Sequence, residues 1–474
     1  MKKHRFLFIC AILCFGSIML KSQSLTPQQI ASIEAIINEE MAEAKMPGAA
    51  FGIIDQNKVV YEKSFGLTNS LTKIPLTDST IFQIASVTKI FTSLALLTEL
   101  KKANISVNGP IGDLIRGLST RLSKLTYHQL LTHTSGMVDF IPSTTEFSLD
   151  TYTFFRNAGD SLLFAEPGTV FSYSNIGYVL VGLALEKLCN KTYPQAIQDI
   201  IINPLKLTNT TFDLYQVACR SFSAGHRFNQ KLNISLPYLI HLESPLVQAA
   251  GGLFSTVKDL ESFAICLINQ GVLDGKQIFD KDIIKNMSTG YAKHFMASGP
   301  YYGFMSYPNN AYGYGLFMFS LGNLRFTGNG GSGSQMAYFI YEPESKFAMI
   351  SINNSNSEFL INSFKKIFEV VLGEKELQLT ISIQDKLEWK AIVGTYILHN
   401  LKFKNESRLE IFEKGENLYI RFGNSQDIKM DQIDVLTYKF FNPGSRFPLE
   451  LLFYRDHSGK VNYMSHFWRA WEKI

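Results

Sequence analysis

At four places in this chain of 474 residues, a serine is followed three residues later by a lysine. On a helix such a pair shares one face, so the lysine amine can reach the serine hydroxyl. A serine hydroxyl is a weak nucleophile near neutral pH and needs a neighbouring base, and a lysine can serve when burial or a nearby positive charge lowers its pKa. The four pairs are Ser70/Lys73, Ser86/Lys89, Ser255/Lys258 and Ser363/Lys366.

The surrounding sequence favours Ser86 over the other three serines. An apolar run from Ile90 to Leu97 follows it closely, so Ser86 is predicted to stand at the start of a buried helix. Backbone N–H groups and the helix dipole at that position favour a developing negative charge. For any single pair, the alternative is a polar turn of a surface helix.

A tyrosine and an asparagine two residues apart, Tyr173 and Asn175, form a second candidate group after the turn Pro167-Gly168. A phenol beside a lysine ammonium can have a lowered pKa and act as a proton shuttle. The asparagine amide offers a donor and an acceptor to a substrate amide or to the lysine. Because the same spacing recurs at 307–309, a tyrosine packed in a turn remains the alternative.

A glycine-rich stretch at 327–334 precedes a strand-like run at 338–341. Glycines beside a strand allow a substrate backbone to approach closely. Taken alone, this stretch is also typical of a flexible hairpin loop.

Five phrases in this order resemble motifs of the class C β-lactamase and penicillin-binding serine hydrolase superfamily, and the resemblance covers most of residues 26–372. The fourth phrase contains Ser255/Lys258, which explains that pair as structural and not as a second active site. The phrases are Phe82–Lys89, Leu130–Gly136, Pro167–Tyr178, Ala249–Thr256 and Tyr312–Gly315.

The resemblance implies catalytic roles for three side chains. Ser86 would be acylated, Lys89 and Tyr173 would share the proton transfers, and Asn175 would position the substrate. The backbone N–H groups of Ser86 and Ser332 would form the oxyanion hole, which typically contributes ~3 kcal/mol per donor.

The third motif of the family departs from its usual pattern here. Asn329-Gly330-Gly331 takes its place, which makes Asn329 and Gly331 candidate substrate-binding residues. Most relatives carry Lys or His where Asn329 stands, and the alternative alignment, at 326–328, also lacks a cation. The resemblance therefore implies no positive group at this place for a substrate carboxylate.

Other hydrolase classes fit the sequence poorly. No group of His, Cys, Asp and Glu has the spacing of zinc ligands, so neither a metal nor another cofactor is predicted. No Gly-x-Ser-x-Gly element with a following histidine indicates an α/β-hydrolase triad. His133 lies in the second phrase and is interpreted as a structural histidine.

The elements that must position these residues follow an α+β order. A helix is predicted over 26–45, a β-hairpin over 49–66, mostly helical segments over about 80–290, and strands at 313–320, 336–342 and 347–353. This order predicts an antiparallel sheet flanked by helices, with a mostly helical insertion, as in the β-lactamase and transpeptidase fold.

The predicted domains are a signal peptide at 1–24, a hydrolase domain at 25–372, a linker at 373–385 and a small antiparallel β domain at 386–474. The last contains short strand-like runs separated by turns, and it weakly resembles β-barrel-like domains appended to some members of the superfamily. Substrate gating, stability and binding are its candidate roles.

The N-terminus predicts export. A basic start precedes the 15 uncharged residues of Phe6–Leu20, which are few for a membrane-spanning helix and typical of a secretory signal peptide. An uncleaved anchor is the alternative. No later stretch is long and apolar enough to span a bilayer, so a periplasmic or secreted protein without a stable membrane span is expected after cleavage.

Charge and motifs together define the expected function. Loss of the leader takes the 45 Lys and Arg to 41, equal to the 41 Asp and Glu, so nothing suggests nucleic-acid binding. A serine hydrolase acting on a small-molecule or peptide substrate is expected, whether as esterase, D-amino-acid peptidase or β-lactamase. The alternative is a non-catalytic penicillin-binding or sensor module on the same scaffold.

Overall fold

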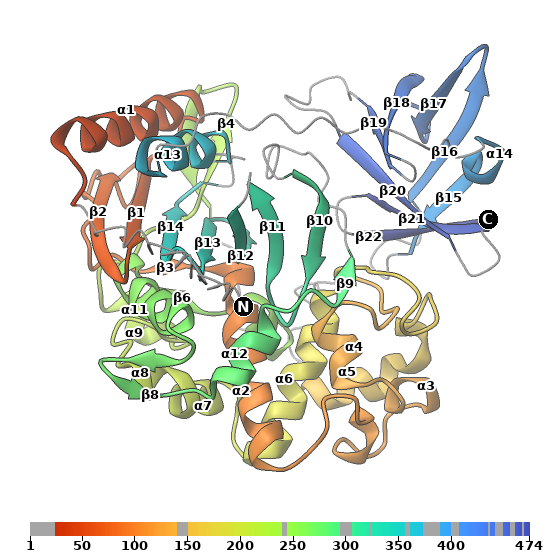
Figure 1. The fold of residues 1–474 in the computed structure, drawn as a ribbon, viewed down its shortest axis with the longest axis horizontal. Coiled ribbons are helices and arrows are strands. Elements are labelled where there is room, and N and C mark those ends of the chain that lie inside the picture. Colours follow the sequence, from red (N-terminus) through yellow and green to blue (C-terminus); the bar gives the residue numbers. More distant parts are fainter. Residues whose placement is uncertain are drawn as a thin grey trace, which may run out of the picture.

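The computed structural model describes residues 24–139, 150–238, 244–293, 306–321, 324–355, 361–372, 389–399, 407–434, 437–440, 449–455, 460–466 and 469–474. A mixed helix-and-sheet domain lies beside a C-terminal β-barrel (Figure 1). The predicted signal peptide, apart from Ser24, and the predicted linker over 373–385 lie outside the described residues.

An eight-stranded antiparallel sheet forms the centre of the first domain. Its N-terminal hairpin pairs with the last strand of the domain, Ala49 opposite Asn353, so the two ends of the domain meet in the sheet. Across the sheet the strands are β2 (Lys58–Gly66), β1 (Gly48–Asp55), β14 (Phe347–Asn353), β13 (Met336–Glu342), β12 (Leu324–Ser332), β11 (Phe317–Leu321), β10 (Ser306–Tyr312) and β9 (Ala292–Lys293).

The hairpin predicted over 49–66 is confirmed, and its turn explains the register. Gln56 and Asn57 have φ angles of 47° and 65°, as the two central residues of a type I′ turn require. By contrast, the strand predicted over 313–320 begins only at Phe317, because a turn with Gly315 at φ 77° precedes it. That turn lies against the backbone of Lys89, where a Cβ on Gly315 would be 2.7 Å from the carbonyl oxygen.

Helices cover both faces of the sheet, as predicted. On one face α1 (Pro27–Glu43) and α13 (Ile361–Leu372) bury Ile33, Ile37 and Phe364 against the strands. The other face carries α11 (Val257–Ile268) and the helical insertion between β2 and β9.

The insertion is built around two helices that are buried along most of their length. α2 (Thr88–Lys102) and α6 (Asn175–Cys189) pack on each other and on α10 (Pro245–Gly251), which buries most of their side chains. The other helices of the insertion are α3 (Thr120–Ser123), α4 (Tyr127–Leu131), α5 (Thr151–Ala158), α7 (Tyr193–Ile197), α8 (Asn203–Leu205), α9 (Leu214–Ala218) and α12 (Lys281–Met287). The short helix α14 (Trp389–Ile392) lies directly before the barrel and packs into its core.

Short elements complete this domain. They are the 3₁₀ turns η1 (Ala85–Val87), η2 (Ile111–Asp113) and η3 (Gly159–Leu162), the π turn η4 (Gln198–Ile202), and the strand pairs β3 (Phe82–Gln83) with β6 (Phe254–Ser255), β4 (His226–Asn229) with β5 (Ile234–Pro237), and β7 (Val272–Leu273) with β8 (Lys276–Gln277).

The predicted C-terminal β domain is a closed antiparallel barrel. Its last strand pairs with its first, Tyr396 opposite Lys473, which leaves no free edge between them. The strands are β15 (Gly394–Leu398), β16 (Ser407–Lys414), β17 (Asn417–Phe422), β18 (Ile428–Asp434), β19 (Thr437–Phe440), β20 (Leu449–Arg455), β21 (Val461–His466) and β22 (Arg469–Lys473).

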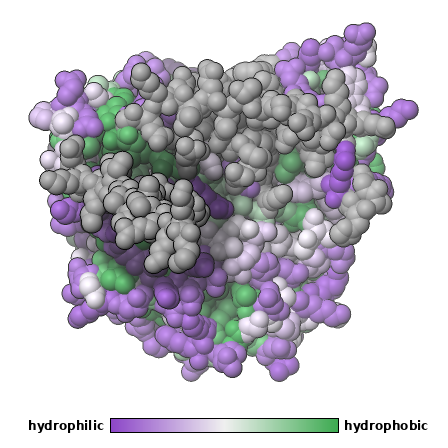
Figure 2. Space-filling view, in the orientation of Figure 1, coloured by the Kyte–Doolittle hydropathy of each residue, from purple (hydrophilic) through white to green (hydrophobic). Residues whose placement is uncertain are grey.

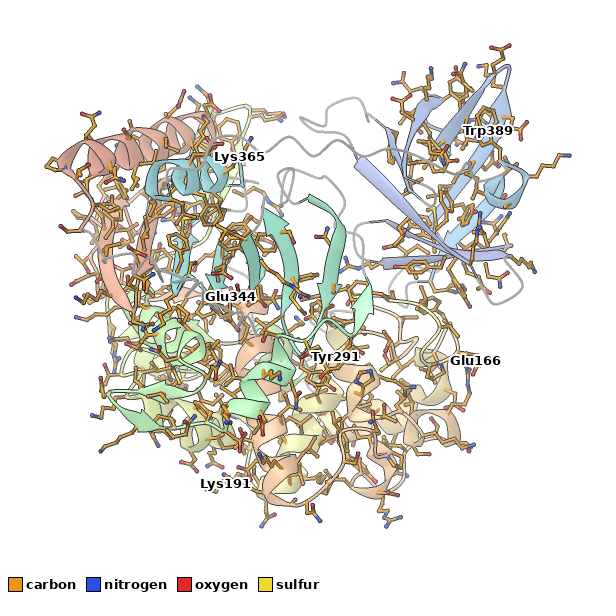
Figure 3. The ribbon with its side chains drawn as sticks, in the orientation of Figure 1. Glu166, Lys191, Tyr291, Glu344, Lys365 and Trp389 are labelled. Carbon is orange, nitrogen blue, oxygen red and sulfur yellow. The ribbon has the colours of Figure 1, made fainter. Side chains whose placement is uncertain are left out.

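The barrel docks on the segment that leads to the tyrosine motif. Phe164 stacks on His399 of the barrel and meets Tyr463 edge-on, while Ala165 and Val170 pack against Ala470. Figure 3 labels Glu166 in this segment, on the barrel's side of the helical part. The two domains therefore share a small apolar contact next to the motif.

Polar residues make up most of the described surface on one face of the molecule (Figure 2). Scattered apolar patches interrupt this face. None of the helices in the described part of the chain combines the length and apolar character that crossing a bilayer requires.

One buried carboxyl group outside the sequence motifs affects stability. Glu261 of α11 is 2% exposed and lies over Gly52 of β1, where a Cβ would be 2.2 Å from its Oε1. Burial raises the pKa of Glu261 to about 9, the nearby Glu62 adds to the rise, and Lys258 opposes it. The group is therefore protonated in the folded protein at neutral pH.

We expect Glu261→Gln to stabilise the protein increasingly as pH rises. Folded Glu261 binds its proton more tightly than Glu261 in the unfolded chain, so its contribution to the free energy of unfolding falls between pH 4.5 and about 9, by ~1.4 kcal/mol per pH unit. Urea unfolding of wild type and variant at several pH values measures the gap. The control is Glu39→Gln, at an exposed position of helix α1. Free energies of unfolding that change equally with pH in the two variants would contradict this prediction.

Candidate active site

Ser86 sits at a strained turn that exposes its hydroxyl. Residues 81–97 are all buried except Ser86, which is half-buried. It lies in η1 immediately before α2, and Ala85 before it has a φ of 43°, a conformation unusual for a residue with a Cβ. The predicted placement of Ser86 at the start of a buried helix is confirmed.

Lys89, one turn along, contacts the Ser86 hydroxyl. Its Nζ lies 2.9 Å from Ser86 Oγ, 2.8 Å from Asn175 Oδ1 and 2.6 Å from the carbonyl oxygen of Ala250. The last two atoms can only accept hydrogen bonds. A neutral amine donates its two hydrogens to them, which directs its lone pair at the Ser86 O–H.

The environment of Lys89 favours that neutral form. Complete burial lowers its pKa to about 7; Asp139 opposes this fall and Arg469 adds to it. Its Nζ also lies 4.9 Å from the ring centre of Tyr173 and 5.6 Å from that of Tyr178. A lysine with such a pKa can act as a base near neutral pH.

Tyr173 occupies the loop before α6 and is almost fully buried. Its ring stacks at 4.2 Å on His133 and at 6.1 Å on Phe317. Burial raises the pKa of Tyr173 well above its ordinary value, and a hydrogen bond with Ser86 offsets only part of that rise. The lowered phenol pKa expected from the sequence is wrong, because burial of Tyr173 outweighs the interactions that lower its pKa; Tyr173 remains a proton donor.

Asn175 is the first residue of α6, where Ser174 Oγ caps the helix by accepting a hydrogen bond from Gly177 N–H. Its side-chain and backbone N–H groups donate to Asp139 Oδ1 at 3.0 and 2.8 Å. This pairing turns the amide oxygen toward Lys89. Of the two partners considered for Asn175, the structure thus shows the lysine.

β12 brings the glycine-rich stretch beside the nucleophile. A Cβ on Gly331 would lie 2.2 Å from the carbonyl oxygen of Ile84 and 3.0 Å from Ser86 N, so only glycine allows this approach. Ser332 follows at the exposed strand end. This places the Ser332 backbone next to Ser86, as an oxyanion hole requires.

Asn329 lies on the same strand but points to a different partner. It is 3% exposed, and its Nδ2 donates to the carbonyl oxygen of Gly315 at 2.8 Å. The structure therefore brings Gly331 and Ser332 to Ser86, while the Asn329 amide holds the Tyr312–Gly315 phrase in place.

Sequence reasoning missed two charged residues of the site, Asp139 and Arg469. Arg469 of the barrel donates from Nε to Asp139 Oδ2 at 2.8 Å, and its Nη2 pairs with the same oxygen. Asp139 stands three residues after the second motif, which was a usable indication. Nothing in the sequence around Arg469 marked it.

His133 is held by a buried backbone hydrogen bond. His133 Nδ1 accepts a hydrogen bond of 3.1 Å from Ser174 N–H, which agrees with the structural role predicted for it. Within the described residues, no group of three or more His, Cys, Asp and Glu could hold a metal ion.

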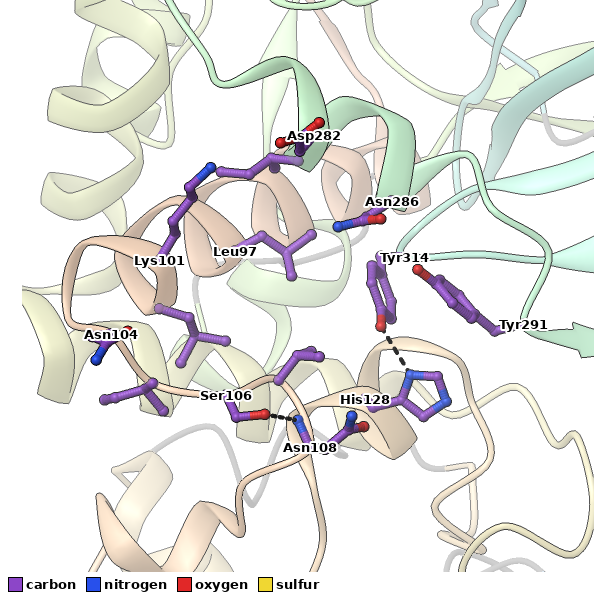
Figure 4. A pocket seen from close by; sticks show the side chains of 14 residues that line it. Leu97, Lys101, Asn104, Ser106, Asn108, His128, Asp282, Asn286, Tyr291 and Tyr314 are labelled. Carbon is purple, nitrogen blue, oxygen red and sulfur yellow. Dashed lines mark hydrogen bonds between the residues drawn. The ribbon is translucent and has the colours of Figure 1, made fainter.

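A cavity of about 820 Å³ lies away from this site, between α2 and α12 (Figure 4). His128 donates to or accepts from the Tyr314 hydroxyl at 2.9 Å on its wall, and Tyr291 stacks on Tyr314. Neither Ser86 nor Lys89 lines it. The cavity is therefore separate from the catalytic group.

Comparisons with known proteins show the family of the chain. The family described as Beta-lactamase matches residues 33–368. Protein flp of Staphylococcus aureus (strain MW2) is 24% identical over 392 residues, which cover 80% of this chain and 73% of that protein. A Beta-lactamase of Escherichia coli (strain K12) is 25% identical over 298 residues, 62% of this chain and 74% of that protein.

Solved structures share the fold. The octameric penicillin-binding protein homologue from Pyrococcus abyssi is 26% identical, with a TM-score of 0.64 over 94% of this chain and 100% of that one. The crystal structure of SurE, at 20% identity, has a TM-score of 0.74 over 94% of this chain and 99% of its own. With the family match spanning most of its length, the chain belongs to the Beta-lactamase family, within the superfamily that its motifs resemble.

Proposed function

We propose that this chain is an exported serine hydrolase that forms an acyl-enzyme on Ser86 and hydrolyses an ester or amide outside the cytoplasm. The observation that carries the proposal is the buried Lys89 amine, 2.9 Å from the Ser86 hydroxyl and otherwise bound to two carbonyl oxygens. Export rests on the basic and then uncharged N-terminal leader.

Acylation begins when neutral Lys89 takes the hydroxyl proton and Ser86 Oγ forms a bond to the substrate carbonyl carbon. The oxyanion develops beside the backbone N–H groups of Ser86 and Ser332. The bond to the leaving alcohol or amine then breaks, and the Lys89–Tyr173 pair returns a proton to it. Water attacks the Ser86 ester through the same groups and releases the acid.

The charges of the site favour an uncharged substrate. The third motif supplies Asn329 in place of a cation, and the Arg469 guanidinium is already paired with Asp139. A substrate carboxylate would therefore meet no uncompensated positive charge among these residues. We infer that neutral esters or amides are preferred to anionic ones.

Replacing the nucleophile tests the enzyme directly. Ser86→Ala should abolish both hydrolysis of a p-nitrophenyl ester and labelling by a fluorophosphonate, while thermal unfolding stays close to wild type. Ser255→Ala, in the other motif-borne Ser/Lys pair, is the matched control and should be labelled normally at Ser86. A wild-type protein that takes up neither a fluorophosphonate nor a penicillin would favour the non-catalytic binding module instead.

The pH dependence of acylation should report the Lys89 amine. Below its pKa the lysine is an ammonium and cannot accept the Ser86 proton. The labelling rate should therefore fall about tenfold per unit on the acid side and be half-maximal near pH 7. Stopped-flow or gel-based labelling across this range measures it, with Lys102→Met, exposed on the same helix, as the control. A midpoint at the ordinary lysine pKa would refute the role of burial.

Substrate charge can be tested with two esters that share a leaving group. p-Nitrophenyl butyrate is neutral, and the mono-p-nitrophenyl ester of succinate adds a carboxylate. Losing a charged hydrogen-bond partner costs ~1 kcal/mol or more, so kcat/KM should favour the neutral ester by several-fold to about tenfold. A chromogenic cephalosporin should be the poorer substrate as well. Preference for either anionic compound would contradict the inference.

A further inference from the structure

The last strand of the barrel reaches the residue before Tyr173. Ala470 of β22 donates its backbone N–H to Ser172 Oγ at 3.1 Å, and both residues are buried. A hydrogen bond shielded from water keeps its geometry well. The barrel therefore fixes the loop on the N-terminal side of the tyrosine.

The first residue of β22, Arg469, reaches the other side of the tyrosine through Asp139. The two donors of Arg469 both meet Asp139 Oδ2, and the second carboxylate oxygen accepts the two N–H groups of Asn175. The side chains of Asp139 and Arg469 are 11% and 29% exposed. One chain of contacts thus runs from the barrel through Asp139 and Asn175 to Lys89.

We propose that Arg469 is a positioning residue of the active site: it holds Asp139 on Asn175, which keeps the Asn175 carbonyl on Lys89 and the Lys89 lone pair on Ser86. The proposal rests on the acyl-enzyme function and deepens it, because it makes the barrel part of the catalytic centre. Without Arg469, no guanidinium would compensate the negative charge of the Asp139 carboxylate. That charge would favour the ammonium form of Lys89, which cannot accept a proton.

The groups around Lys89 make this testable by pH. Ser86, on the same segment as Lys89, and the rings of Tyr173 and Tyr178, from the α6 region, lie close to the amine, with His133 behind Tyr173. The charges that act on the amine are those of Asp139, from its loop, and Arg469, from the barrel. Asp139 raises the pKa of Lys89 and Arg469 lowers it. Removing the charge of Arg469 should therefore shift the pH profile of labelling upward, and removing that of Asp139 should shift it downward.

The experiment compares Arg469→Met, Arg469→Lys and Asp139→Asn with wild type in the full-length protein. The control is Arg421→Met, which removes an arginine of barrel strand β17 that is paired with Asp427. The readout is the fluorophosphonate labelling rate against pH, in which Ser86 Oγ bonds to phosphorus, fluoride leaves and Lys89 takes the proton. Thermal unfolding is measured for every variant.

We expect Arg469→Met to slow labelling between tenfold and a hundredfold at pH 7, the range that a small misplacement of catalytic groups produces. The pH midpoint of labelling should rise in Arg469→Met and fall in Asp139→Asn. Arg469→Lys should recover part of the labelling rate. Arg421→Met should match wild type in both rate and midpoint.

Labelling of Arg469→Met with the rate and midpoint of Arg421→Met would overturn the proposal. So would a smaller labelled fraction with an unchanged midpoint, since that is what loss of folded protein alone produces. Should Arg469→Met not fold, a wild-type labelling rate in Arg469→Lys together with an unchanged midpoint in Asp139→Asn would overturn it. Absence of Ser86 labelling in wild type would instead reject the proposed function itself.

Discussion

Desolvation of the Lys89 amine is the constraint on which the rest of the site depends. A buried ammonium is costly unless it is fully compensated, so burial shifts this lysine toward its neutral form and makes it a base. Its two hydrogens still need acceptors, and these come from Asn175 of α6 and Ala250 of α10. The packing of three helices, and not the Ser-x-x-Lys spacing alone, thus creates the base.

Close backbone approach is what allows this packing. A Cβ on Gly182 of α6 would lie 2.5 Å from the Ala249 side chain of α10, so glycine lets these helices meet behind Lys89. Gly315 admits a turn against the Lys89 backbone, and Gly331 admits β12 beside Ser86. The amine is sealed on one side while the hydroxyl stays open, because each glycine removes a side chain at one point of contact.

The elements that depend on neighbouring residues could be predicted from the sequence. The hairpin at 49–66, the apolar helix after Ser86 and the α+β order all follow from periodicity and turn residues, and the structure confirms them. The protonation of Tyr173 could not be predicted, because its pKa depends on burial and on the charges of Asp139 and Arg469, which tertiary packing brings close. The hydrogen bond from Asn329 to the carbonyl oxygen of Gly315 could not be predicted either, because the pairing of β11 with β12 brings these two residues together.

The Asp139–Arg469 pair lay furthest from prediction, because its two residues are 330 positions apart and belong to different domains. An exposed ion pair contributes little to stability, whereas a part-buried one becomes costly when a single partner is lost. The apolar contact of Phe164 with His399 and Tyr463 places the barrel, but it fixes no charge. The ion pair supplies that charge. The Arg469 guanidinium compensates the negative charge of Asp139, so the carboxylate can orient Asn175 without favouring the ammonium form of Lys89.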